Sequence, residues 1–152
     1  MKQLLYSILF LFIGITSYSQ DSFPKSWQGN YEGELEIYAV DSVRMQVNMK
    51  LKIQPIASDS LYSWTIIYNI KGKEDIREYE LKIVEAKTGH YQIDEKNSII
   101  IDGYYKNKVF TSFFKVMDNF IIATYTMNDT NQLVFEIISS NAKEVSTTGG
   151  EK

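Results

Sequence analysis

The sequence predicts an all-β protein, an up-and-down antiparallel β-barrel (lipocalin-like) of eight or nine strands that follows an N-terminal signal peptide. Three observations predict this fold. Apolar and polar residues alternate with a period of two along most of the chain, as in a half-buried strand. Residues that favour strands are abundant, with 11 Tyr and 8 Phe among 152 residues. Short polar turns separate the runs at regular intervals, which is typical of neighbouring strands in a meander.

The first 19 residues have the features of a secretory signal peptide. Lys2 provides the positive start, residues 4–15 are apolar and uncharged, and Ser17 and Ser19 are the small residues expected before cleavage after Ser19. The apolar run is shorter than the ~20 residues that a membrane-spanning helix needs, so we expect no membrane span in the mature chain. Exported proteins of Gram-negative bacteria have similar leaders, and we therefore expect a secreted or periplasmic protein.

Two runs show the strand period most clearly. In residues 27–40, three glutamates alternate with apolar residues, so that one face is polar and the other apolar. In residues 43–54, every position between the apolar residues is polar, and a helix would need apolar spacings of three and four instead. The apolar residues of this second run are Met45, Val47, Met49, Leu51 and Ile53.

The other strands follow between turns rich in Gly, Asn and Asp, residues that favour tight turns. Residues 61–70 include apolar side chains at both odd and even positions, which suits a strand covered on both sides. We expect a lead-in at residues 20–26, a barrel domain at 27–139, a disordered tail at 140–152 and no helix. The expected strands are residues 27–40, 43–54, 61–70, 76–85, 91–94, 98–105, 109–117, 120–127 and 133–138.

Strand length and connection length favour a barrel over a sandwich. Several expected strands are longer than the usual five or six residues, and long tilted strands suit barrel closure. Immunoglobulin-like sandwiches need long crossovers between sheets, and the sequence has only short polar connections. Closure would also remove exposed strand edges.

Composition excludes several classes of function. The chain has no Cys, which excludes disulfides, thiolate metal sites and cysteine nucleophiles. Its net charge of −3 and its lack of a basic cluster argue against nucleic-acid binding. One His and no Cys favour a non-enzymatic protein, and the sequence suggests no catalytic residue, metal ligand or cofactor. We expect a monomer.

The start of the mature domain resembles the first strand of calycin (lipocalin-like) barrels, which often carry a Trp and closely spaced glycines. The residues that carry the resemblance are Trp27-Gln28-Gly29-Asn30-Tyr31-Glu32-Gly33. The resemblance implies a Trp that plugs one end of the barrel. The chain departs from lipocalins in having Trp-x-Gly rather than Gly-x-Trp, and it lacks their C-terminal helix. The later patterns resemble uncharacterised secreted proteins of Bacteroidota; they are Trp64-x-x-x-Tyr68, Arg77-x-Tyr79-x-Leu81 and Tyr91-x-Ile93-Asp94-Glu95.

Arg77 is the most suggestive candidate for binding. By parity it shares the apolar face of its strand with Tyr79 and Leu81. A guanidinium on an inward face must be paired, because unpaired buried charge is costly. Three partners remain open: an internal carboxylate, the acidic group of a ligand, or water at the barrel mouth.

Amphipathic aromatic residues are the other candidates, because they provide an apolar wall and a polar tip. The predicted ligand-binding set is Arg77, Trp64, Tyr68, Tyr79, Tyr31 and Tyr125. Eight-stranded barrels either fill with side chains or hold one small ligand, and the sequence leaves both open.

Two polar features favour structural roles over chemistry. His90 follows a Gly near a turn, where a solvated histidine is the ordinary outcome, and no Gly-x-Ser-x-Gly is present to supply a nucleophile. The oxygen-bearing cluster Asp94, Glu95, Asn97 and Asp102 offers ligands that Ca²⁺ uses, but its residues are also those of a polar hairpin corner.

Two functions remain. In the first, an exported barrel binds a small hydrophobic, amphipathic or acidic ligand in its open end, with a cavity that reaches Arg77. In the second, a side-chain-filled barrel is a structural or protein-interaction module of the cell envelope. The second function predicts an exposed apolar patch, for which the outer face of residues 61–70 is the expected place.

Overall fold

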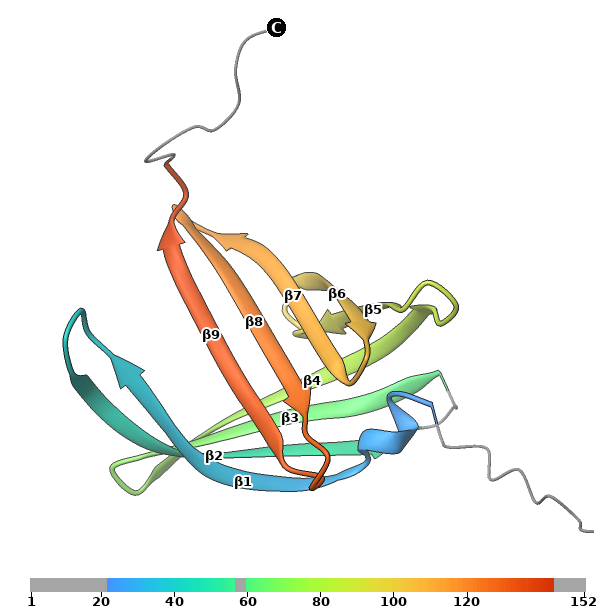
Figure 1. Cartoon of the computed structure of the whole chain (residues 1–152), viewed down its shortest axis with the longest axis horizontal. Helices are drawn as coiled ribbons and strands as arrows, with labels where there is room; N and C mark the ends of the chain where they lie inside the picture. The colour runs from blue at the N-terminus through green and yellow to red at the C-terminus, as the bar shows by residue number, and fades with distance from the viewer. Residues whose placement is uncertain (1–21, 57–59, 144–152) are drawn as a thin grey trace, which may run out of the picture.

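The computed structural model describes residues 22–56 and 60–143. The expected signal peptide and most of the expected tail lie outside these residues. Nine antiparallel strands form one sheet in the order β1 to β9, which curls into a nearly closed barrel (Figure 1). The strands are β1 (Gly29–Tyr38), β2 (Val43–Pro55), β3 (Leu61–Ile70), β4 (Lys73–Glu85), β5 (His90–Asp94), β6 (Ile100–Lys106), β7 (Val109–Val116), β8 (Asn119–Met127) and β9 (Leu133–Asn141).

The predicted all-β up-and-down barrel is therefore confirmed, and every expected strand is present, β3 with the predicted ends and the others with shifted ends. One short element differs from the expectation of no helix: Lys25–Trp27 form a turn of 3₁₀ helix. Its backbone bond from Trp27 N–H to Pro24 O, at 2.9 Å, closes the turn and moves Trp27 out of the first strand. The turn lets Phe23 and Trp27 both face the barrel interior, where both are buried.

The period of two explains the core. In β2 the side chains of Val47, Met49, Leu51 and Ile53 are buried, while the polar residues between them are largely exposed. The β2 register carries this inward face onto β3, where Ile53 pairs with Trp64 and Leu51 pairs with Ile66. Burial is concentrated at the end of the barrel where β1 begins and β2 ends.

Aromatic side chains plug that end. The Phe23 ring stacks on Tyr105 with 4.2 Å between ring centroids and meets Trp27 edge-on at 4.9 Å. Two tyrosine hydroxyl groups donate hydrogen bonds to backbone carbonyl oxygens of the plug. Tyr91 OH donates to Phe23 O at 3.2 Å, and Tyr31 OH donates to Trp27 O at 2.9 Å. Trp27 thus lies at one end of the barrel, where the calycin resemblance implies it.

The barrel is not sealed along its length. β1 pairs only with β2 and β9 pairs only with β8 in the described sheet, so each keeps one free backbone edge. The expectation that closure removes the strand edges does not hold for these two strands. Within residues 22–56 and 60–143, no helix is long and apolar enough to cross a membrane.

Candidate functional site

The mouth of the barrel, opposite the aromatic plug, contains an interior cavity of about 110 Å³. Its apolar wall includes Trp64, Ile66, Phe110 and Phe135, and its polar lining includes Arg77, Glu95 and Ser112. This volume is below the ~300 Å³ at which drug-sized ligand pockets begin. It is close to the ~150 Å³ of an engineered cavity that admits benzene. The interior is therefore largely filled, with space left for one small apolar group.

Five of the six residues predicted to bind a ligand line this one cavity: Arg77, Trp64, Tyr68, Tyr79 and Tyr125. The sheet register explains their convergence, because Trp64 pairs with Tyr79 and Ile66 pairs with Arg77 across β3 and β4. The sixth, Tyr31, is not in this set. It lines a separate pocket between β1 and β9, and its hydroxyl is bonded to Trp27.

Arg77 lies at the mouth, with its side chain 46% exposed. Asp75, two residues earlier on β4, accepts from Nε at 3.3 Å and from Nη2 at 3.1 Å. The guanidinium also lies over the Tyr68 ring, 4.8 Å from its centroid. Partial burial works to lower the pKa of Arg77, but the bond to Asp75 and the nearby phenols raise it above its ordinary value, so this group stays charged.

The phenols around Arg77 stay neutral. Burial raises the pKa of Tyr79, and the carboxylate of Glu95 raises it further, while Arg77 opposes both effects. Burial also raises the pKa of Tyr68 and, more strongly, that of fully enclosed Tyr125. The mouth thus combines one guanidinium, two carboxylates (Asp75 and Glu95) and neutral hydroxyl groups beside an apolar cavity.

A notch in the wall leads outward from the cavity. β4 pairs with the short β5 only from Glu80 onward, so the Lys73–Tyr79 part of β4 has no β5 neighbour. There, a surface cleft of about 640 Å³ lies between β4 and the β5–β6 corner. Arg77, Tyr79 and Glu95 line both the cleft and the cavity, so they stand between the two spaces.

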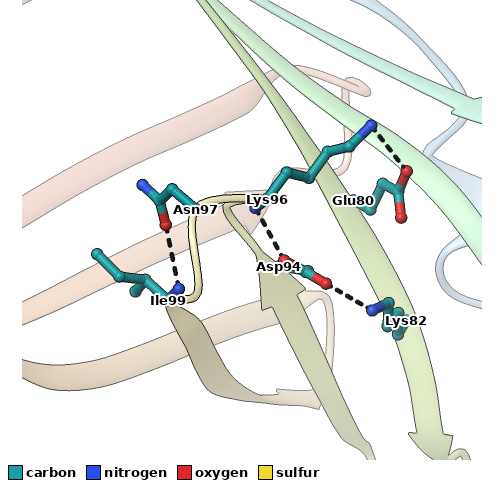
Figure 2. A network of polar contacts seen from close by, with 6 residues as sticks. All are labelled: Glu80, Lys82, Asp94, Lys96, Asn97 and Ile99. Carbon is teal, nitrogen blue, oxygen red and sulfur yellow. Dashed lines mark hydrogen bonds and ion pairs between the residues drawn. The ribbon is translucent and has the colours of Figure 1, made fainter.

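The β5–β6 corner that borders the notch is tied to β4 by two ion pairs (Figure 2). Lys82 Nζ lies 2.6 Å from Asp94 Oδ2, and Lys96 Nζ lies 3.1 Å from Glu80 Oε1. Asp94 Oδ1 also accepts from the backbone N–H of Lys96 at 2.8 Å. The hydrogen bond from Lys82, with help from Lys96, lowers the pKa of Asp94.

These contacts decide the role of the acidic cluster singled out in the sequence. Asp94 holds the corner, and Asn97 Oδ1 accepts from Ile99 N–H at 3.1 Å. Asp102 lies on β6, where it contacts His90 of β5. Only Glu95 lines the cavity. Among the described residues, no group of three or more His, Asp and Glu side chains is placed to hold a metal ion.

His90 lies away from the cavity, on the outer face of β5. Its Nε2 is 2.7 Å from Asp102 Oδ1, and its ring stacks on Tyr104 with centroids 5.2 Å apart. Gln92 Nε2 donates to the same Asp102 oxygen at 3.0 Å. This group is a surface network that links β5 to β6.

The outer face of β3, where an interaction patch was expected, offers no exposed apolar surface; Ile67 is buried and Thr65 is polar. An exposed apolar row lies instead across β7, β8 and β9, where Phe113 pairs with Ile122 and Ile122 pairs with Ile138.

Parity could have placed two acidic residues of the mouth beside Arg77: Asp75, which was not singled out, and Glu95, which was assigned only to the polar corner. Asp75 has the same parity as Arg77, and Glu95 has the same parity as Tyr91 and Ile93. No family model, curated protein or solved structure matches the chain. The nine-stranded meander is consistent with a calycin-like fold.

Proposed function

We propose that this protein binds a small amphipathic molecule at the mouth of the barrel. The apolar part of the molecule enters the cavity beside Trp64 and Tyr68, and its polar head stays at Arg77. One observation carries the proposal: the guanidinium stands where the apolar cavity meets the open cleft. Binding of this kind combines burial of apolar ligand surface with one oriented polar contact.

The chemistry of the head group follows from the donors that remain. A guanidinium has five N–H donors; Asp75 engages Nε and Nη2, and the Tyr79 hydroxyl is a further hydrogen-bond partner of Arg77. The remaining N–H groups are the donors for a ligand oxygen. Asp75 and Glu95 also place two negative charges beside this one positive charge. The site therefore suits a head that accepts hydrogen bonds and carries at most one negative charge, such as an amide or a carboxylate.

The size of the tail follows from the cavity. A space of about 110 Å³ admits one short alkyl or aryl group and no more, so a long or branched tail would have to lie in the cleft. We therefore expect short-chain molecules to bind as well as their longer analogues.

The test uses three probes with one tail and different heads: hexanamide, hexanoate and hexylamine. Binding is measured by saturation-transfer NMR and isothermal titration calorimetry. Hexanamide and hexanoate are expected to bind, and hexylamine is not. The Arg77→Ala variant should weaken the two complexes about tenfold or more, as loss of a charge-assisted hydrogen bond would. The matched control is Arg44→Ala, which removes the other arginine, an exposed one on β2.

A variant that fills the cavity provides a second arm. Ala123 lines the cavity, and Ala123→Val should weaken all binding while leaving Arg77 in place. Equal binding by the parent chain, Arg77→Ala and Ala123→Val would refute the proposed site, as would preferential binding of hexylamine.

A further inference from the structure

The two free strand edges face each other across one opening of the barrel, which we call the seam. Strands alternate in direction along a meander, so with nine strands β1 and β9 run parallel. Figure 1 shows them side by side near their first residues and diverging toward their ends. One further strand, antiparallel to both, would have the direction needed to pair with β1 on one side and β9 on the other.

The seam contains open space along its length. A pocket of about 120 Å³ lies near the start of the two strands, and Gly33 leaves room in its wall because nothing lies within 4 Å of where a Cβ would stand. A wider groove of about 590 Å³ follows between residues 35–38 of β1 and residues 135–139 of β9. The seam is thus narrow where the strands converge and broad where they diverge.

Side chains on the two faces of the seam differ in character. Tyr31 and Leu35 of β1 and Phe135 and Ile137 of β9 have the inward parity and are apolar or aromatic. The outward parity carries Glu32, Glu34 and Glu36 on β1, and Val134, Glu136 and Ile138 on β9. Among the described residues, no ion pair engages Glu34 or Glu136, whereas Glu32 lies 3.4 Å from Lys50.

We propose that an extended segment of a partner protein, in which apolar and basic residues alternate, adds to the seam as a tenth strand between β1 and β9. Its backbone pairs with the two free edges, which is a common mode of peptide recognition. Its apolar side chains face inward over Leu35 and Phe135. Its lysines or arginines lay their apolar stems along Val134 and Ile138, and their charged ends reach Glu34 and Glu136.

Charge favours such a partner over a second copy of this chain. A second copy would bring its own β1 or β9 edge, and with it further glutamates, against Glu34 and Glu136. Like charges directly opposite in a sheet are destabilising, whereas opposite charges stabilise it. The occupant is therefore basic on its outer face.

The test uses a fluorescent peptide of about eight residues that alternates valine and lysine, a usual strand length. Binding to the full chain is followed by fluorescence anisotropy at several salt concentrations. We expect saturable binding that weakens with salt, and no binding of a valine–glutamate peptide. Two further peptides, N-methylated at one or the other set of alternate residues, keep all side chains but lose the amide donors of one edge. Both should bind at least about tenfold more weakly.

Variants locate the binding on the seam. Glu34→Lys and Glu136→Lys together should weaken binding about tenfold, since each replaces an attractive charge pair by a repulsive one. Glu74→Lys, at an exposed site on β4, makes the charge change of one seam substitution away from the seam and should have little effect. Gly33→Val fills the narrow pocket and should weaken binding with no change in charge.

Three results would overturn the proposal. The first is that the N-methylated peptides bind as well as the parent peptide. The second is that the Glu74→Lys variant loses as much affinity as the seam variants. The third is that the chain sediments as a dimer that Gly33→Val dissociates. The last result would make the seam an interface between two copies. The proposal does not depend on the ligand cavity, because the substituted residues do not line it.

Discussion

Replacing Gly103 with alanine tests the packing of the barrel interior. Gly103 lies on β6 with its α-carbon facing the Phe110 ring. An added Cβ would overlap Cζ of that ring and lie 2.5 Å from Cε2 and 2.8 Å from the Ser112 hydroxyl. Phe110 has no exposed surface and packs edge-on against Trp64 with centroids 5.6 Å apart, so its ring can move only into the cavity that it lines and at the expense of this packing. We expect Gly103→Ala to lower the free energy of unfolding by about 2–3 kcal/mol, as overpacking does.

The assay is equilibrium unfolding in urea, followed by the fluorescence of the two buried tryptophans. Gly33→Ala is the control, because its Cβ meets open space; its stability should lie within about 0.5 kcal/mol of the parent. Phe110→Leu removes the overlapped atoms, so the Gly103→Ala/Phe110→Leu double variant should lose at least about 1 kcal/mol less than the sum of the single losses. Additive losses, or a fully stable Gly103→Ala protein, would refute this account of the packing.

Two further predictions concern a turn and a surface pair. Gly89 has φ +73°, and a Cβ there would overlap the Tyr105 carbonyl oxygen, so Gly89→Ala should cost about 3 kcal/mol or more in urea unfolding. Gly72→Ala, with φ +80° in open space, should cost about 1 kcal/mol; equal costs would show that the overlap does not matter. The hydrogen bond from His90 lowers the pKa of Asp102, so its stabilisation is complete above the ordinary carboxyl pKa of about 4 and is lost as the pH falls through the lower folded pKa. Asp102→Asn should therefore flatten the fall in stability between pH 5 and about pH 2, measured by urea unfolding; an unchanged slope would contradict the assignment.

Periodicity predicted the fold because, in a meander, the alternation within each strand and the turn before it are enough to place that strand. The alternation from Met45 to Ile53 fixes one inward face, and the short polar turns then place each strand beside the one before it. The main departure is Trp27. Its turn depends on a backbone bond to Pro24 and on the fit of Phe23 inside the plug, and neither leaves a trace in the alternation.

The candidate site was partly predictable for the same reason. Parity alone places Trp64, Tyr68, Arg77 and Tyr79 toward one interior, and the structure brings them to one cavity. The volume of that cavity could not be predicted, because it depends on how far Phe110 and other distant side chains reach across the barrel. The notch also escaped prediction, since it arises from the pairing length of β5 and not from its sequence period.

The seam exists because β1 and β9 do not pair to close the barrel. Whether a barrel closes depends on strand tilt and register around the whole sheet. At the plugged end, stacked aromatic rings bury the core without help from a β1–β9 ladder. At the mouth, the inward side chains of Ile37, Met45 and Ile137 remain 36%, 39% and 51% exposed. Burying such apolar surface is favourable by about 25 cal/mol per Å². Both proposed occupants would therefore bind more tightly by covering apolar surface that the barrel leaves exposed to water. The Tyr125–Phe135 stack, with centroids 4.5 Å apart, lines both the cavity and the narrow seam pocket, so it stands between these two spaces.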